Sequence, residues 1–152
     1  MSVELNFSRG EYDERIAITR RAMEKAGFDV IIVTDPSNMH WLTGYDGWSF
    51  YVHQCVVLAM DGEPLWYGRG QDGNGAKRTA WISHDSIIGY PDHYVQSQER
   101  HPMDLLASIL ETRVGVTKPL QSNSIIIGTP LPPTMHCKSV YRTRNSKTRR
   151  VL

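Results

Sequence analysis

The sequence predicts an α/β fold in which helices flank a mixed β-sheet. Three observations lead to this fold class. One long segment has apolar residues at helical spacing, several short runs are rich in β-branched residues, and the two kinds of segment alternate along the chain. With 152 residues, 40% of them hydrophobic, the chain is long enough to bury the core of one domain.

The clearest expected element is a helix that begins after Ser8 and ends before Gly27. Ser8 and Glu11 have the spacing of a capping box, in which side chains accept hydrogen bonds from unpaired N–H groups at a helix start. Gly27 tolerates the left-handed conformation that ends many helices. Apolar or partly apolar residues recur between them at helical spacing, namely Tyr12, Ile16, Thr19, Met23 and Ala26.

A buried strand, a brief helix and a hairpin are expected next. Residues 30–33 form an apolar run that Asp35 and Pro36 stop, and "NMHWLTGY" follows as a short helix. "VHQCVVLAM" and "PLWYG" are two apolar runs joined by residues 61–63, which predicts a hairpin. Residues 74–82 are then expected as a helix, "DSIIGY" as a strand, and residues 102–111 as a helix opened by proline.

The charge of the chain changes sign near Glu111. Residues 1–111 contain 9 Lys/Arg and all 16 Asp/Glu, a net charge of −7, whereas residues 112–152 hold the other 8 of the 17 basic residues and no acid. Such a reversal normally marks the end of a folded body. We therefore expect residues 112–152 to be a largely disordered basic tail, with "SIIIG" its only segment able to form a strand.

The sequence predicts no catalytic, cofactor or metal site in this chain. "GRGQDG" at residues 68–73 matches the G-x-G-x-x-G pattern, but Gly73 and Gly75 would weaken the helix that a dinucleotide site needs. We therefore interpret it as a glycine-rich turn. No two of the six histidines are four residues apart, and Cys55 and Cys137 are read as unpaired thiols. A nucleophile elbow of the G-x-S-x-G type is also missing from the sequence.

An aromatic segment, "WLTGYDGWSFYVHQ", is the strongest candidate for a contact surface. It places Trp48, Phe50 and Tyr51 near a loop tip beside Gly44 and Gly47. Large aromatic side chains are costly to expose, so they either bury a core or face a ligand or partner. Three of them near a glycine turn favour an interface, while a core role remains open for each one.

The chain is expected to be cytoplasmic. No apolar run approaches the roughly 18 residues of a membrane span. The first residues, Met1 to Glu4, lack the basic and apolar segments of a signal peptide.

The first part of the chain resembles the opening of the creatinase/prolidase family. "EYDERIAITRRAMEKAGFDVIIVTDPSNMHWLTGYDG" has that family's helix and strand, followed by its "NxxYLTG" or "NxxWLTG" motif. The later strings "WSFYVHQCVV", "WYGRGQDGNGAKRT" and "GYPDHYVQSQERHPMD" are similar to members that hydrolyse a small cyclic amidine. The similarity covers about residues 7–111.

This resemblance implies a ribonuclease-H-like mixed sheet flanked by helices, incomplete at its C-terminal end. In the family a following "pita-bread" domain carries catalysis, and the N-terminal domain of one subunit leans over the active site of the other subunit of a homodimer. Residues 1–111 are thus expected to be a partial N-terminal domain, inactive alone, which meets a small-molecule substrate only in the intact dimer. The resemblance proposes two sets of contacts across that dimer, first Trp48, Phe50 and Tyr51, then Arg69, Gln71 and Asp72. An aromatic wall suits an amidinium, because a cation is attracted to the face of an aromatic ring.

Two other functions remain open at this stage. The chain could be a stand-alone ligand-binding or dimerisation module, which would bind the substrate saturably without turnover. The chain could also bind nucleic acid through its basic tail, but the net charge of −7 on residues 1–111 would repel phosphate. We therefore expect neither a nucleic-acid nor a membrane partner.

The tail leads to a prediction about the coding DNA. If residues 135–150 are read from the third base of each codon, codon degeneracy allows "ALQKCLPNAxFKDATR", similar to a string that family members carry before the catalytic domain. Met135 followed by His136 must then give alanine. We expect sequencing to reveal a frameshift between about Leu110 and Arg113. If no single-base change there restores a long open frame, this explanation of the tail is wrong.

Overall fold

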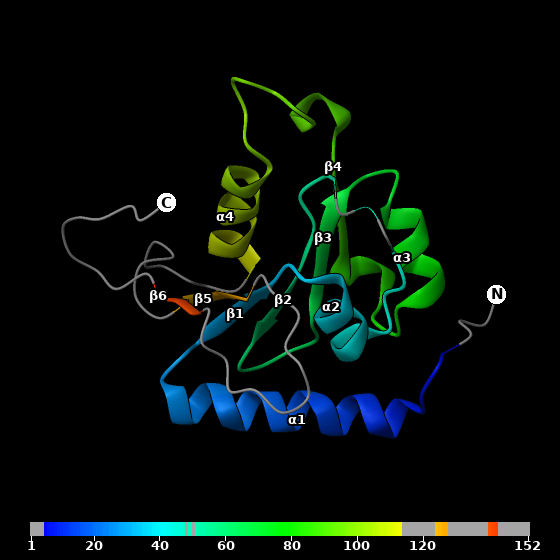
Figure 1. Ribbon diagram of the computed structural model, residues 1–152, viewed down its shortest axis with the longest axis vertical. Helices are drawn as coiled ribbons and strands as arrows, with labels where there is room; N and C mark the ends of the chain where they lie inside the picture. The colour runs from blue at the N-terminus through cyan, green and yellow to red at the C-terminus, as the bar shows by residue number, and fades with distance from the viewer. Residues whose placement is uncertain (1–4, 48, 50, 114–123, 128–139, 143–152) are drawn as a thin grey trace.

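The computed structural model describes residues 5–47, 49, 51–113, 124–127 and 140–142 (Figure 1). Its centre is a six-stranded sheet in the order β4-β3-β2-β1-β5-β6. The strands are β1 (Val30–Val33), β2 (Cys55–Ala59), β3 (Leu65–Arg69), β4 (Ile87–Tyr90), β5 (Ser124–Ile127) and β6 (Val140–Arg142). The helices are α1 (Arg9–Ala26), α2 (Pro36–Thr43), α3 (Gly73–Thr79) and α4 (Pro102–Arg113), with short 3-10 helices at His84–Ser86 and Asp92–Tyr94.

The pairing of the strands confirms the predicted mixed sheet. Strand β2 runs antiparallel to both β1 and β3, which gives the expected hairpin. Strand β4 is parallel to β3, and β5 is parallel to β1. Strand β5 is the "SIIIG" segment of the predicted tail, and β6, which we did not expect, pairs antiparallel with it. The prediction of disorder concerns mainly residues 114–123, 128–139 and 143–152, which lie outside the described part of the chain.

Helix α1 begins and ends where the sequence predicts. The Ser8 side chain accepts a hydrogen bond from the Glu11 N–H at 3.2 Å, and Gly27 ends the helix with φ of 72°. The Glu11 side chain forms an ion pair with Arg15 one turn later. Of the expected apolar face, Tyr12, Ile16 and Met23 are buried, Thr19 is half-buried and Ala26 is exposed. The buried face of α1 therefore ends at Met23, whereas the spacing predicts that it extends to Ala26.

The two residues expected to stop β1 also start α2. The Asp35 side chain accepts a hydrogen bond from the Asn38 N–H at 2.9 Å, and Pro36 occupies the first turn, where its missing N–H costs nothing. Gly44 then ends the helix with φ of 79°. A Cβ at Gly44 would come within 2.9 Å of the Tyr12 hydroxyl, so glycine is needed there for space as well as for conformation.

Helices cover both faces of the sheet. One core cluster joins α1, α2 and α3 to Ile31 and Val33 of β1, and the other joins α4 to Val30 and Ile32 of the same strand. Figure 1 shows α1 and α4 on different sides of the strands. All four residues of β1 are buried, as expected for a strand covered on both faces. Among the described residues, no helix is long and apolar enough to cross a membrane.

The "GRGQDG" segment is a close-packed connection between β3 and α3. A Cβ at Gly68 would lie 2.5 Å from the Trp66 ring, and one at Gly89 would lie 2.6 Å from Gly70 Cα. The Gly70 N–H donates to the Tyr90 carbonyl at 2.9 Å. Helix α3 is only 7 residues long. Close packing thus explains the glycines at positions 68 and 89.

Cys55 is a fully buried free thiol. Burial raises the pKa of Cys55 to about 12, so the thiol stays protonated and unreactive at neutral pH. Cys137 lies outside the described residues.

Gly89→Ala should destabilise the fold, because its new methyl group would press on the Gly70 backbone. We expect a loss of about 1–3 kcal/mol in the free energy of unfolding, the usual cost of overpacking. Gly75→Ala is the matched control. It lies in α3 with no atom within 4 Å of its Cβ position, and the better helix propensity of alanine should add up to about 1 kcal/mol. Urea unfolding measures both, and equal midpoints would contradict the close contact.

Candidate functional site

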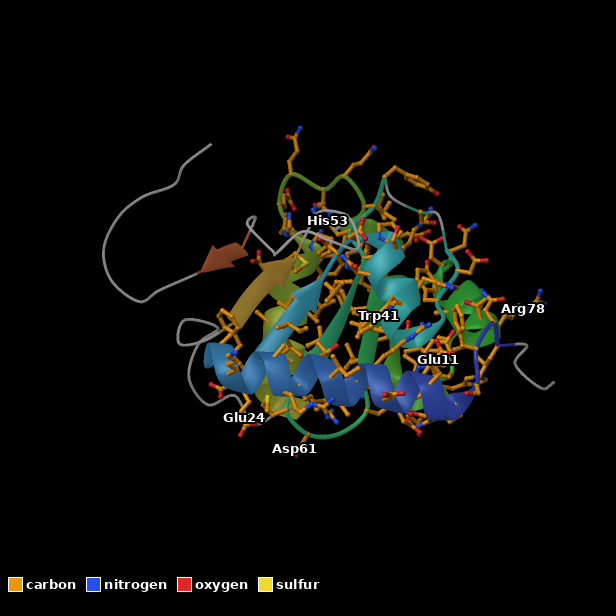
Figure 2. All side chains as sticks on the ribbon, turned by 60° about the horizontal axis from the view of Figure 1, so that its bottom comes forward. Glu11, Glu24, Trp41, His53, Asp61 and Arg78 are labelled. Atoms are coloured by element: carbon orange, nitrogen blue, oxygen red, sulfur yellow. The ribbon has the colours of Figure 1, made fainter. Side chains whose placement is uncertain are left out.

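The candidate residues gather at the end of the sheet where β3 finishes and β2 begins. Because β2 and β3 are antiparallel, the loop before β2 and the turn after β3 meet at the same edge. Figure 2 shows His53, in that loop, far from Asp61 in the β2–β3 turn at the other end of the sheet. Tyr51, Gln71 and Asp72 lie in this loop and turn, next to Arg69 at the end of β3, while Trp48 and Phe50 lie outside the described residues.

Arg69 is held by Asp92, a residue that sequence analysis did not single out. Its Nε lies 2.8 Å from Asp92 Oδ1, and its Nη2 lies 3.1 Å from Asp92 Oδ2. In the sheet, Arg69 is paired with Tyr90 at the end of β4, which brings the following Asp92 beside it. These hydrogen bonds raise the pKa of Arg69 and lower the pKa of Asp92 below its usual value. Both groups therefore remain charged at neutral pH, in a fixed fork geometry.

Three further candidates, Tyr51, Gln71 and Asp72, lie on the same edge and differ in how far their side chains are exposed to solvent. Tyr51 is 60% exposed, the most exposed of the large hydrophobic side chains described. Tyr51 and Asp72 both contribute, less than Asp92, to the raised pKa of Arg69, so the loop and the turn lie near the guanidinium. Gln71 is exposed, and Asp72 is half-buried. Asp72 Oδ2 is buried and has no hydrogen-bond partner among the described residues.

A buried polar layer lies beneath the exposed residues. The Tyr45 hydroxyl donates to Gln54 Oε1 at 2.9 Å, and the Tyr45 ring packs on Trp66 with ring centroids 5.2 Å apart. Burial, and then the negative charges of Asp72 and Asp46, raise the pKa of Tyr45 to about 12. The hydroxyl is thus a permanent donor at neutral pH. The "WLTGYDG" string contains Tyr45, but its spacing alone did not show that this ring turns inward.

Aromatic and imidazole rings continue the site on the α4 side. The Tyr90 hydroxyl donates to the His53 carbonyl at 2.9 Å. The His53 and His101 rings lie edge to face, with centroids 4.6 Å apart. Burial, and then the charge of His101, lower the pKa of His53, which therefore stays neutral at physiological pH. Where the structure places His, Cys, Asp and Glu side chains, no three of them are close enough together to hold a metal ion.

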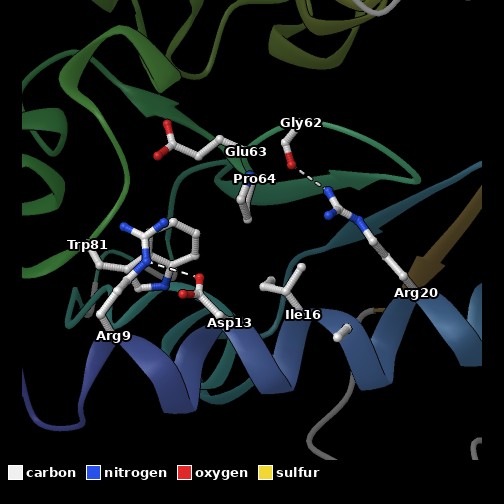
Figure 3. A pocket seen from close by; sticks show the side chains of 9 residues that line it. Arg9, Asp13, Ile16, Arg20, Gly62, Glu63, Pro64 and Trp81 are labelled. Atoms are coloured by element: carbon white, nitrogen blue, oxygen red, sulfur yellow. Dashed lines mark hydrogen bonds and ion pairs between the residues drawn. The ribbon is translucent and has the colours of Figure 1, made fainter.

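A hollow of about 460 Å³ lies away from these residues, between α1 and the β2–β3 turn (Figure 3). The Arg9 guanidinium stacks 3.9 Å from the Trp81 ring centroid and pairs with Asp13 at 3.0 Å. Burial acts to raise the pKa of Glu63, but the hydrogen bonds from Ser83 and Ser86 together have the larger effect. The net result is a pKa of Glu63 below its usual value. The charged side chains of this groove already have partners within the chain. None of the predicted contact residues lines this groove. It is therefore a weaker candidate for the predicted site than the edge formed by the loop before β2 and the turn after β3, which we call the loop edge.

The chain matches known proteins over most of its length. The family model of the creatinase/prolidase N-terminal domain matches residues 15–124. Ectoine hydrolase of Halomonas elongata is 57% identical over 110 residues, which is 72% of this chain and 28% of that protein. An uncharacterized hydrolase/peptidase of Sinorhizobium fredii is 41% identical over 107 residues, 70% of this chain and 27% of that protein. The chain thus spans little more than a quarter of the length of these relatives.

Solved structures show the same fold at low sequence identity. A proline dipeptidase from Streptococcus agalactiae superposes with a TM-score of 0.56 at 16% identity, over 82% of this chain and 99% of that one. The dipeptidase PepE of Mycobacterium ulcerans superposes with a TM-score of 0.54 at 22% identity, over 68% of this chain and 27% of that one. Because the family model covers well over half of the residues, the chain belongs to the creatinase/prolidase family, and residues 15–124 correspond to its N-terminal domain.

Proposed function

We propose that the chain is the non-catalytic N-terminal domain of an ectoine-hydrolase-like enzyme. In the intact enzyme the reaction is hydrolytic opening of the cyclic amidine of ectoine to N-acetyl-diaminobutyrate, a step of ectoine degradation. The observation that carries the proposal is the 57% identity to the ectoine hydrolase of Halomonas elongata over 110 residues. Identity at this level extends beyond what the shared fold requires, since the solved dipeptidases keep the fold at 16–22% identity.

The chemistry of the loop edge supports a role in substrate recognition. Ectoine is a small zwitterion with a delocalised amidinium and a carboxylate. An exposed ring such as Tyr51 can attract the amidinium through its face, and the Arg69 guanidinium can attract the carboxylate. Gln71 and Asp72 add an exposed amide and a carboxylate beside them. Trp48 and Phe50 belong to the same proposed contact set by their place in the sequence.

Catalysis is assigned in this proposal to the rest of the enzyme. Among the described residues of the loop edge, Arg69 is paired with Asp92 and the Tyr45 hydroxyl with Gln54, so neither group is free to act as an acid or a base. We propose that the loop edge meets the substrate when the domain leans over the active site of the second subunit of a homodimer. The chain alone should bind ectoine weakly and not hydrolyse it.

A stand-alone ligand-binding or dimerisation module is the second candidate. The observation that favours it is the dipeptidase structure from Streptococcus agalactiae, of which 99% aligns to part of this chain. A chain of about this size therefore adopts the fold without a further domain in that structure. Saturable binding of ectoine to the purified chain, without turnover, would favour the module over the enzyme part.

A graft into the Halomonas elongata ectoine hydrolase tests the proposed function. Residues 7–111 of this chain replace the matching segment, and we expect the hybrid to hydrolyse ectoine. Tyr51→Ala in the hybrid should raise KM for ectoine about 2- to 30-fold, the range of one cation–π contact, with kcat little changed. Phe7→Ala is the matched control, because Phe7 is an exposed aromatic residue outside the loop.

Two outcomes would contradict the proposal at different levels. A folded, dimeric hybrid without ectoine turnover would remove ectoine as the substrate. An active hybrid whose KM is unchanged by Tyr51→Ala would remove Tyr51 from the contact set. The same assay applies to Trp48, Phe50, Arg69, Gln71 and Asp72.

A further inference from the structure

The loop that carries Tyr51 is closed at its base by a buried hydrogen bond. Tyr45 and Gln54 flank residues 46–53, which we call the substrate loop, and the Tyr45 hydroxyl donates to Gln54 Oε1 at 2.9 Å. Both side chains are nearly inaccessible, with Tyr45 2% and Gln54 5% exposed. A hydrogen bond shielded from water in this way holds two points of the chain nine residues apart.

The Tyr45 ring also sets the path of the substrate loop. A Cβ at Gly47 would lie 1.9 Å from the Tyr45 hydroxyl oxygen and 2.1 Å from its ring carbon Cζ. The backbone at Gly47 therefore crosses directly over the end of the ring. No larger residue fits at position 47 while the ring keeps its place, so the ring and the glycine constrain each other.

Two further hydrogen bonds fix the ends of the substrate loop to the scaffold. The Asp46 N–H donates to Thr79 Oγ1 of α3 at 3.1 Å. At the other end, the His53 carbonyl accepts from the Tyr90 hydroxyl of β4 at 2.9 Å. Within the loop, the Val52 N–H donates to the Ser49 carbonyl at 3.4 Å, which folds the chain back beside Tyr51. The loop is thus anchored to α3, to β4 and across its own base.

The bond from Tyr45 matters most to the Gln54 side chain. Gln54 Nε2 is buried and has no hydrogen-bond partner among the described residues. The bond from the Tyr45 hydroxyl to Oε1 is therefore the one hydrogen bond described for this amide. If the hydroxyl is removed, the whole amide is left unpaired in a buried place. Burying an unpaired polar group is unfavourable, so the amide would turn toward water and open the loop base.

We propose that Tyr45 is a positioning residue for substrate binding. Its hydrogen bond to Gln54 keeps the substrate loop in the conformation that presents Tyr51 to the ligand. This inference rests on the proposed function. In the proposed function the loop makes binding contacts and catalysis belongs to the rest of the enzyme, so loosening the loop should weaken binding and leave the chemical step unchanged.

Tyr45→Phe in this chain tests the loop base without any substrate. Hydrogen–deuterium exchange of peptides covering residues 46–53 should become about 10-fold faster, as expected for the loss of one buried hydrogen bond. Tyr67→Phe is the matched control. It removes an equally buried hydroxyl, bonded to the Pro102 carbonyl at 2.6 Å on the α4 face, and should leave exchange of residues 46–53 unchanged. Equal exchange in both variants would overturn the role of Tyr45.

The hybrid enzyme tests the consequence for function. Tyr45→Phe should raise KM for ectoine about 10-fold with kcat unchanged, and Tyr67→Phe should change neither. In a Gln54→Leu background, Tyr45→Phe should add nothing further, because the partner is already gone. If Tyr45→Phe does not fold, Gln54→Leu alone must reproduce both the faster exchange and the higher KM.

The outcomes separate this inference from the proposed function. An active hybrid in which Tyr45→Phe and Gln54→Leu leave KM unchanged would overturn the inference and leave the proposed function intact. An inactive hybrid, combined with faster loop exchange in the Tyr45→Phe chain, would overturn the proposed function and the role in ectoine binding, while showing that the hydrogen bond holds the loop.

Discussion

The fold depends on the burial of β1 on both of its faces. Its residues alternate between two apolar clusters, so the strand is stable only while helices cover both sides of the sheet. Helices α1, α2 and α3 supply one cover and α4 supplies the other. Burying a side chain of this size stabilises the fold by about 1.5–3 kcal/mol, and β1 contributes four of them at once. Strands β2 and β5 pair with it directly, on its two edges.

This double cover also explains where the candidate site lies. With both faces of the sheet occupied, polar groups collect at the strand ends, where loops reach water. The ends of β3 and β4 bring Arg69 and Asp92 together, and the start of β2 brings the substrate loop beside them. The site is therefore anchored to the ends of paired strands, although Tyr51 itself lies at the surface.

Most elements could be predicted from the sequence because their signals are local. Ser8 and Gly27 bound α1, Asp35 and Gly44 bound α2, and the apolar runs around residues 61–63 give the hairpin. The placement of β5 against β1 had no such signal, because parallel partners are chosen by long-range packing.

The candidate site was harder to predict for the same reason. Tyr51 was named first from its aromatic segment, and Arg69, Gln71 and Asp72 from a resemblance; the structure brings them to one edge. Asp92 becomes the partner of Arg69 only through the register of β3 and β4. Tyr45 and Gln54 are nine residues apart in an aromatic segment, and no spacing rule distinguishes the ring that turns inward from those near the tip.

The closed base of the substrate loop has an evolutionary consequence. The buried hydrogen bond and the close ring contact involve Tyr45, Gly47 and Gln54, whereas the Tyr51 side chain between them is exposed. Substitution of Tyr51 can therefore change this surface without requiring the sheet or its helices to repack. A scaffold of this kind can diverge in substrate while its architecture persists, and the family members it resembles include both an ectoine hydrolase and proline dipeptidases.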